Sequence, residues 1–194
     1  MANEASNSAI MTVHRYLLSK EGRRNAQVAL AAAFPFLVHW GKAKAVQSIQ
    51  QDGLIPRTQG IDSIVDAADI KAAFDGIVPA ALCLSDPMHP LDPMQDGPWV
   101  QFAVQTRDLP DCVCLDWTLR ASWRLPLVLL DDGQCDTPEA AFVEAFRRCR
   151  SVVVAEPIPA DRLRIRLVDS PPDMPGNWPP FHQYDGRRVY VREV

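Results

Sequence analysis

The chain has 194 residues, of which 47% are hydrophobic and 23% are charged, and its formal net charge is −4. This composition is typical of a globular protein and excludes fibrous and disordered classes, while the length fits one domain with a sizeable core. The acidic net charge argues against a protein that coats nucleic acid through a uniformly basic surface.

The sequence predicts a cytoplasmic protein that does not associate with membranes. No apolar run approaches the ~20 residues that a membrane-spanning helix needs, and residues 1–18 lack the basic and apolar segments of a secretion signal. The five cysteines form no disulfide framework, so we expect most of them to be reduced thiols.

The N-terminal part of the chain predicts two helices, a strand and a short third helix. Residues 5–33 carry the two helices, with an expected break at Gly22. Residues 34–40, FPFLVHW, predict a buried strand that ends in a histidine and a tryptophan. Residues 42–54 predict a helix whose C-terminal stop is Gly53, since glycine readily takes the left-handed conformation there.

The remainder predicts strands scattered between a few helices. Thr137-Pro138-Glu139 opens one helix, because Thr is a good N-cap, Pro suits the first helical position and an acid suits the first turn. That helix is expected to run to about Arg148, and another short helix is expected near residues 67–74. The predicted strands lie at residues 78–86, 99–106, 112–117, 125–132, 151–159, 163–170 and 188–193.

The predicted fold class is α+β, because strands and helices do not alternate regularly. We expect a single domain over residues 1–194. It comprises N-terminal helices over 1–33, a core over 34–170, and a Pro-rich tail over 171–194 that ends in a strand.

Two polar residues at the ends of apolar strands are the first candidates for a binding site. His39 ends one predicted strand, where its ring N–H could donate to a ligand hydroxyl; a histidine bonded to backbone at the edge of the core explains it about equally well. Ser85 ends another strand, and alone it is typical of a turn cap. Together they predict that neighbouring strands end at one concave pocket.

The other chemical candidates are a carboxylate and two thiols. Glu156 follows a strongly apolar strand, where a carboxylate is either a cap or a catalytic group. Cys112 and Cys114 share one face of a predicted strand. Zinc needs four ligands and no second pair is nearby, so we expect buried thiols and no metal site. The sequence contains no Gly-rich phosphate loop, HExxH or GxSxG motif.

Residues 37–57, LVHWGKAKAVQSIQQDGLIPR, resemble the opening motif of ADP-ribosyltransferase-fold proteins, in particular the DNA-targeting toxins of the DarT type. Those proteins begin with a strand that ends in His, followed by a short helix of the pattern NL..I...GL. The likeness covers roughly residues 35–170, and only this first motif is distinctive. Further segments resemble the family in the same order: VPAALCLSDPMHPLDPM, WVQFAVQTRDLPD and SVVVAEPIPADRLRIRLV.

The resemblance implies a split β-sheet whose central cleft holds NAD. It implies that His39 contacts the nicotinamide ribose or the adenosine side of NAD, and that Ser85 packs the nicotinamide. The family's late Glu falls on Ser151 here, and Glu156 lies five residues further along. The Arg that precedes the second motif in DarT-type proteins is also missing, since this segment offers only Lys71.

A carboxylate matters to this chemistry because breaking the nicotinamide–ribose bond builds positive charge on the ribose. Three residues could supply a displaced one. Asp132 ends a predicted strand, Glu139 lies in the first turn of a predicted helix, and Glu156 closes the strand that carries the carboxylate in the family. The resemblance therefore ranks Glu156 first as the catalytic residue.

Three functions are consistent with the resemblance. The first is an NAD-dependent enzyme that transfers ADP-ribose to a macromolecule, nucleic acid or protein, in a bacterial toxin or conflict setting with an antitoxin or other protein as partner. The second is a catalytically inactive module of the same fold that binds a nucleotide or a protein. The third is an RNA 2′-phosphotransferase-like enzyme, which the cluster of Arg147, Arg148 and Arg150 allows.

Overall fold

The computed structural model describes residues 13, 15–56, 82–85, 99–110, 113–115, 120–169, 180–184 and 187–193. Strands of this part of the chain form one eight-stranded sheet in the order β4-β5-β2-β1-β3-β6-β8-β7, and each neighbouring pair is antiparallel. The strands are β1 (Phe36–Lys42), β2 (Leu82–Ser85), β3 (Trp99–Gln105), β4 (Val113–Leu115), β5 (Ser151–Val154), β6 (Leu163–Asp169), β7 (Pro180–Tyr184) and β8 (Arg187–Glu193).

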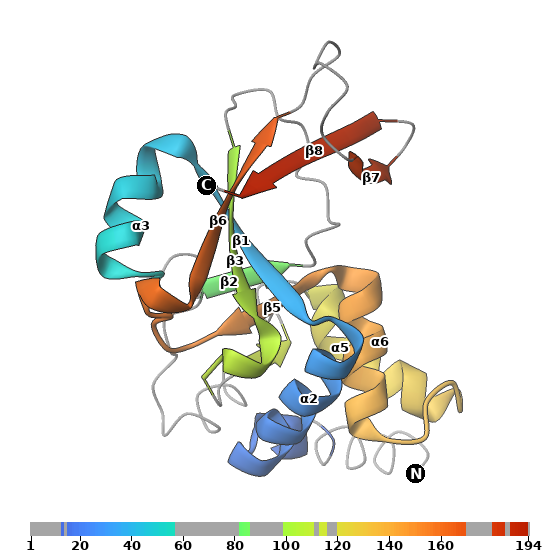
Figure 1. The fold of residues 1–194 in the computed structure, drawn as a ribbon. Coiled ribbons are helices and arrows are strands. Elements are labelled where there is room, and N and C mark those ends of the chain that lie inside the picture. The colour runs from blue at the N-terminus through green and yellow to red at the C-terminus, as the bar shows by residue number, and fades with distance from the viewer. Residues whose placement is uncertain are drawn as a thin grey trace.

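The helices gather in two places. Helices α2, α5 and α6 lie together at one end of the sheet, whereas α3 lies apart from them beside β6 (Figure 1). The fold class is therefore α+β, as predicted. None of the helices in the described segments is long and apolar enough to cross a membrane. The helical elements are α2 (Lys20–Ala33), η1 (Ala43–Ala45), α3 (Val46–Asp52), η3 (Thr106–Asp108), α5 (Arg120–Asp131), α6 (Pro138–Cys149) and η4 (Ala160–Arg162).

The N-terminal helical segment breaks at Ser19, not at Gly22 as predicted. Residues 15–18 are helical, and Ser19 then caps α2, its hydroxyl accepting a hydrogen bond from the backbone N–H of Gly22 at 3.0 Å. Gly22 lies inside α2 at a crowded point, where a Cβ would lie 1.9 Å from the carbonyl oxygen of Tyr16. The helix ends before Pro35, which disfavours a helical conformation in the residue that precedes it.

β1 continues to Lys42, so the prediction that His39 closes this strand is wrong. The whole of β1 pairs with β3, from Phe36 opposite Gln105 to Lys42 opposite Trp99. Hydrogen bonding to the neighbouring strand therefore carries β1 beyond its apolar residues.

Residues 125–132 lie at the end of helix α5, so the strand predicted there is wrong. Leu favours helices, and a short apolar run alone does not distinguish a strand from a buried helix. Pro126 is inside the helix, and it is buried together with Leu127 and Leu129. Because Asp132 follows this helix, it does not end a strand.

The other helices and strands predicted over described residues are present, except that Lys42 belongs to β1 and not to the helix predicted over residues 42–54. Gly53 follows the last residue of α3, and α6 begins after Thr137, whose hydroxyl accepts a hydrogen bond from the N–H of Ala140 at 3.2 Å. Strands β2 to β6 and β8 occur at the predicted positions, while the sequence does not predict β7. The predicted helix near residues 67–74 lies outside the described residues.

One hydrophobic core joins the sheet to the helices. Its largest fully buried side chains include Phe102 of β3 with Phe142 and Phe146 of α6, and each such burial contributes roughly 2–3 kcal/mol. Phe34, at the end of α2, packs edge-on against Phe146 with ring centroids 4.8 Å apart. This contact fixes the end of α2 to α6 just before the chain enters β1.

Within the described residues, β1 and β2 separate beyond one point. They pair at Val38, opposite Ser85, and no described residue of β1 from His39 to Lys42 pairs with β2, whereas β2 pairs with β5 along its whole length. Because the two strands are antiparallel, the sheet opens where β1 continues toward Lys42 and β2 begins at Leu82. This opening positions the candidate site.

Gly53 holds the end of α3 against the segment that follows β5. Its φ of 77° and ψ of −167° belong to a region that essentially only glycine occupies. Its N–H donates to the carbonyl of Ile49 at 2.9 Å, and the adjacent Leu54 exchanges two backbone hydrogen bonds with Ile158, both 2.9 Å long. A Cβ on Gly53 would lie 2.3 Å from the carbonyl oxygen of Ile158.

We predict that Gly53→Ala lowers the free energy of unfolding by about 3 kcal/mol, because backbone strain and a clash with backbone both contribute. Gly133→Ala is the matched control. Gly133 also has a positive φ, 64°, but nothing lies within 4 Å of a Cβ placed there, so its loss should be about 1 kcal/mol. Urea unfolding measures both variants, and equal losses would contradict the close approach at Gly53.

Candidate functional site

A cavity lies where the sheet opens between β1 and β2. Its volume is about 520 Å³, within the range of roughly 300–1,000 Å³ that is typical of small-molecule and cofactor sites. One wall comes from the two strands and the other from α3 and the residues that follow it. The cavity therefore joins the two halves of the sheet to the helix that stands over the opening.

The strand wall carries His39, Gly41, Leu82 and Cys83. The Nδ1 atom of His39 lies 3.0 Å from the carbonyl oxygen of Cys83, and the ring is 6.5 Å from that of Phe102. Because a carbonyl can only accept, Nδ1 carries the proton and donates it to a hydrogen bond across the opening.

This hydrogen bond decides what the other ring nitrogen of His39 can do. In the neutral ring Nε2 is then an acceptor, so it suits a ligand hydroxyl that donates. The sequence analysis expected the ring N–H to donate to the ligand, and the bond to Cys83 reverses that direction.

The helix wall carries Ala45, Ser48, Ile49 and Asp52. Their spacing puts them on one face of the helical segment, with Ser48 and Asp52 as its polar members. The hydroxyl of Ser48 donates to the carbonyl of Ala45 at 3.0 Å. Sequence reasoning missed both polar residues, although helical spacing counted back from Gly53 would have put them on one face.

The residues after α3 complete the lining with apolar groups. Leu54 is buried, whereas Ile55 is 56% exposed, and both line the cavity. The site thus combines apolar side chains with a few polar ones, which is the pattern of a small-molecule pocket.

Ser85 does not line this cavity. It stands opposite Val38 in the antiparallel pair, so by the alternation of strand side chains it projects from the opposite face of the sheet to His39. Its side chain is buried, and its Oγ lies 3.5 Å from the carbonyl oxygen of Val38. The prediction that His39 and Ser85 line one pocket is therefore wrong, which counts against the second motif of the resemblance.

Ser151 and Glu156 lie toward opposite ends of β5. Ser151 is opposite Ser85, whereas Val154 is opposite Leu82. Leu82 lines the cavity and Ser85 does not. The position that the resemblance gives to the catalytic carboxylate is thus at the far end of β5, and Glu156 is at the end nearer the cavity.

The backbone on either side of Glu156 pairs with residues that line the cavity, although the Glu156 side chain is exposed and does not line it. Glu156 lies between the last residue of β5 and Ile158, which forms a bridge with Leu54. Leu54 belongs to the cavity lining. A carboxylate at Glu156 is therefore anchored on both sides to segments that form the site.

The other two candidate carboxylates lie among the helices. Asp132 is exposed after α5, where the side-chain amide of Gln134 donates to it at 3.4 Å. Glu139 accepts a hydrogen bond from the hydroxyl of Tyr16. None of the three carboxylates lines the cavity. The geometry favours Glu156 because it alone lies between residues that pair with the cavity lining, Val154 with Leu82 and Ile158 with Leu54.

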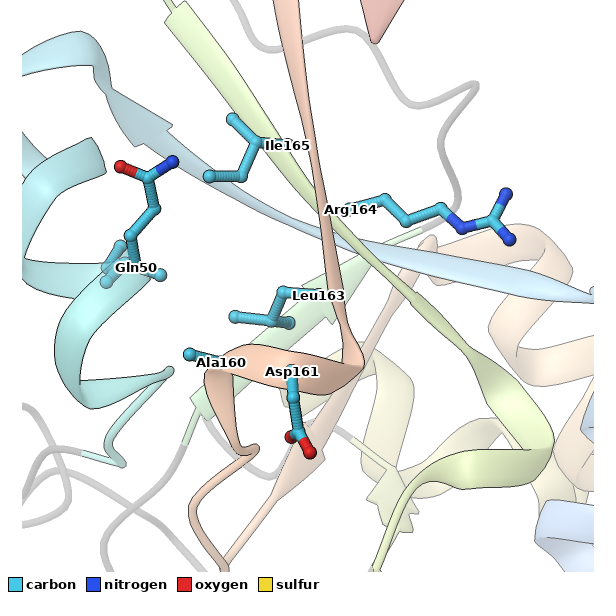
Figure 2. Close-up of a pocket in the computed structure, with 7 residues that line it drawn as sticks. Gln50, Ala160, Asp161, Leu163, Arg164 and Ile165 are labelled. Atoms are coloured by element: carbon cyan, nitrogen blue, oxygen red, sulfur yellow. The ribbon is translucent and has the colours of Figure 1, made fainter. Parts of the chain in front are cut away.

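A second cavity, of about 620 Å³, lies between α3, η4 and β6. Figure 2 shows Gln50 facing Ile165 and Leu163 across it, while Arg164 extends on the other side of β6. Ile49 borders both cavities. We take the first cavity as the candidate site because it contains a histidine whose orientation is fixed and because it lies at the opening of the sheet.

Thiols and metal ligands do not add a second kind of site within the described residues. Cys114 is buried, as predicted, and Cys83 is exposed; neither forms a disulfide. Cys112 lies outside the described residues. No group of three or more His, Cys, Asp or Glu side chains in these segments is arranged to hold a metal ion.

Comparison with protein-family models, with curated proteins and with solved structures finds no match to this chain.

The hydrogen bond between Tyr16 and Glu139 has a structural role, because it connects the N-terminal helical segment to α6. The hydrogen bond to Glu139 raises the pKa of Tyr16 above its usual 10.0, and the amide of Asn25 donates to the same hydroxyl at 3.0 Å. Tyr16→Phe should therefore lower the free energy of unfolding by about 1 kcal/mol at neutral pH.

The pH dependence of this contact follows from the raised pKa of Tyr16. Such a group stabilises the fold below its unfolded pKa and loses that contribution as the pH rises through its folded pKa. The difference between Tyr16→Phe and the unmodified protein should thus shrink above pH 10. Urea unfolding across this range tests it, and equal stability at neutral pH would contradict the structural role.

Proposed function

We propose that the cavity between α3 and strands β1 and β2 binds NAD, and that the protein transfers ADP-ribose from NAD to a macromolecule. The observation that carries this proposal is His39. Its ring lines the cavity, is oriented by the carbonyl of Cys83, and offers an acceptor to a ligand hydroxyl. The two riboses of NAD supply hydroxyls of that kind.

The arrangement of the sheet supports the resemblance on which NAD rests. ADP-ribosyltransferase-fold proteins have a split sheet with a central cleft, and they carry a strand histidine at the NAD site. Here the sheet opens beside the pair of Val38 in β1 and Ser85 in β2, and a cavity occupies the opening. The distinctive motif, residues 37–57, contributes His39 and the helix wall.

The proposed reaction needs a group that stabilises the positive charge that develops on the ribose. Transfer breaks the bond between the nicotinamide nitrogen and C1′ of the ribose, and the electron pair of that bond neutralises the cationic ring. The acceptor joins C1′ and loses a proton to a base. A carboxylate near C1′ stabilises the charge that develops and can orient the acceptor, and we assign this role to Glu156.

A specific observation also favours a second function, nucleotide binding without turnover. The resemblance puts Ser151 where the family has its carboxylate, and Glu156 is exposed outside the cavity lining. A chain with this site would bind NAD or a related nucleotide and leave it intact. The same cavity and the same contact with His39 serve both functions, so the two differ only in turnover.

The phosphotransferase alternative has less support. The arginine cluster that suggested it lies at the end of α6, where Arg147 and Arg148 bind Glu144 at 2.6 and 2.9 Å. Neither arginine lines the cavity. By resemblance alone, we propose a nucleic acid or protein acceptor, a bacterial toxin setting in the cytoplasm, and an antitoxin as a protein partner.

We predict that His39→Ala weakens NAD binding about tenfold, the effect of losing one hydrogen bond. Glu156→Gln should retain NAD binding but lower NAD cleavage about a hundredfold, the typical effect of removing one preorganised electrostatic group. Asp132→Asn is the matched control, because it removes an exposed carboxylate that lies after α5. Calorimetric titration measures binding, and release of nicotinamide measures cleavage.

The outcomes separate the alternatives. Cleavage that is unchanged in Glu156→Gln removes this residue from the mechanism. Binding of NAD without cleavage by the unmodified protein, with nucleic acid and protein acceptors supplied, decides for the binding module. If the unmodified protein does not bind NAD, or if His39→Ala binds it equally well, the proposed site is wrong.

A further inference from the structure

Asp52 brings a negative charge to the cavity that the resemblance does not assign. It is the last residue of α3, it is exposed, and it lines the cavity. Within the described part of the chain, its carboxylate forms no salt bridge and no side-chain hydrogen bond. The group is therefore available to a ligand that enters this wall of the site.

Stability of the helix does not explain an acid at this position. A negative side chain at a helix C-terminus lies near the exposed carbonyl groups of the last turn, which is unfavourable. The end of α3 is already closed by the N–H of Gly53, which donates to the carbonyl of Ile49 at 2.9 Å. Asp52 adds nothing to this cap, so we look for its role in the cavity.

The surroundings of Asp52 restrict the chemistry of the ligand group that it can receive. Ser48 lies one turn earlier on the same wall, Ile55 is at the exposed end of the lining, and His39 is on the strand wall. A carboxylate with two acceptor oxygens suits a vicinal diol, which can donate both of its hydroxyl protons. The same carboxylate repels a phosphate that replaces one of these two hydroxyls.

We infer that Asp52 binds the 2′- and 3′-hydroxyls of the adenosine ribose of NAD, and that its charge excludes NADP, which carries a 2′-phosphate. The inference rests on the proposed NAD site. Acidic residues make this discrimination in other dinucleotide-binding folds, where a carboxylate accepts from the ribose 2′-hydroxyl and an arginine accommodates the 2′-phosphate. Asp52 makes the cavity specific for the unphosphorylated dinucleotide.

The test compares the affinity of the protein for NAD and for NADP by calorimetric titration. We expect the unmodified chain to prefer NAD by about tenfold or more, the ratio that one charge-assisted hydrogen bond can produce. Asp52→Asn should weaken NAD binding, strengthen NADP binding, and bring the two affinities within about threefold of each other. Thermal unfolding of this variant should occur at the same temperature as in the unmodified protein or slightly above it, because Asp52 has no partner to lose within the described residues and its charge is unfavourable at the end of α3.

Asp161→Asn is the matched control. Asp161 is also exposed, but it lines the second cavity, between α3 and β6. Its substitution removes the same unit of charge and should leave the ratio of NAD to NADP affinity unchanged. If the ratio of NAD to NADP affinity shifts equally in both variants, the preference comes from net charge, and the role of Asp52 is overturned.

The remaining outcomes distinguish this inference from the proposed function. If NAD binds and His39→Ala weakens it, but Asp52→Asn leaves the ratio unchanged, only the assignment of Asp52 is overturned. If the unmodified protein binds NAD and NADP equally, the assignment of Asp52 is likewise overturned. If it binds neither dinucleotide, the NAD site and this inference both fail.

Discussion

The separation of β1 from β2 beyond the pair of Val38 and Ser85 is the constraint on which the candidate site depends, because no described residue from His39 to Lys42 pairs with β2. Strands that separate expose backbone groups that need other partners. Here the ring of His39 donates a hydrogen bond to the carbonyl of Cys83. The bridge between Leu54 and Ile158 holds the segment after α3 beside the segment after β5. These contacts provide hydrogen-bond partners for backbone groups at the opening. The same contacts hold the walls of the cavity in place, so the candidate site depends on the fold of the sheet.

The sequence predicted those elements of the fold whose ends are marked by particular residues. Thr137 caps α6 and Gly53 closes α3, and both effects are local. The failures occur where tertiary packing decides. Residues 125–132 are apolar enough for a strand, but residues 125–131 form the end of helix α5. β1 passes His39 because β3 pairs with it as far as Lys42. The local sequence does not show which elements will pack against a segment or pair with it.

The site was predictable only in part, for the same reason. His39 follows from the motif, and its ring does line the cavity. The orientation of Ser85 depends on strand register, which puts it on the other face of the sheet. Register also decides that Glu156, rather than Ser151, is at the end of β5 near the cavity. Asp52 could be recognised only after the cavity had identified which face of α3 matters.

The central claim is that the opening in the sheet binds a dinucleotide, and a crystal structure of the protein grown with NAD tests it most directly. The account predicts NAD between α3 and β1, with a ribose hydroxyl within hydrogen-bond distance of Nε2 of His39 and the hydrogen bond from Nδ1 to Cys83 intact. NAD seated elsewhere, for instance in the cavity between α3 and β6, would contradict the claim. So would an empty opening at a saturating concentration of NAD.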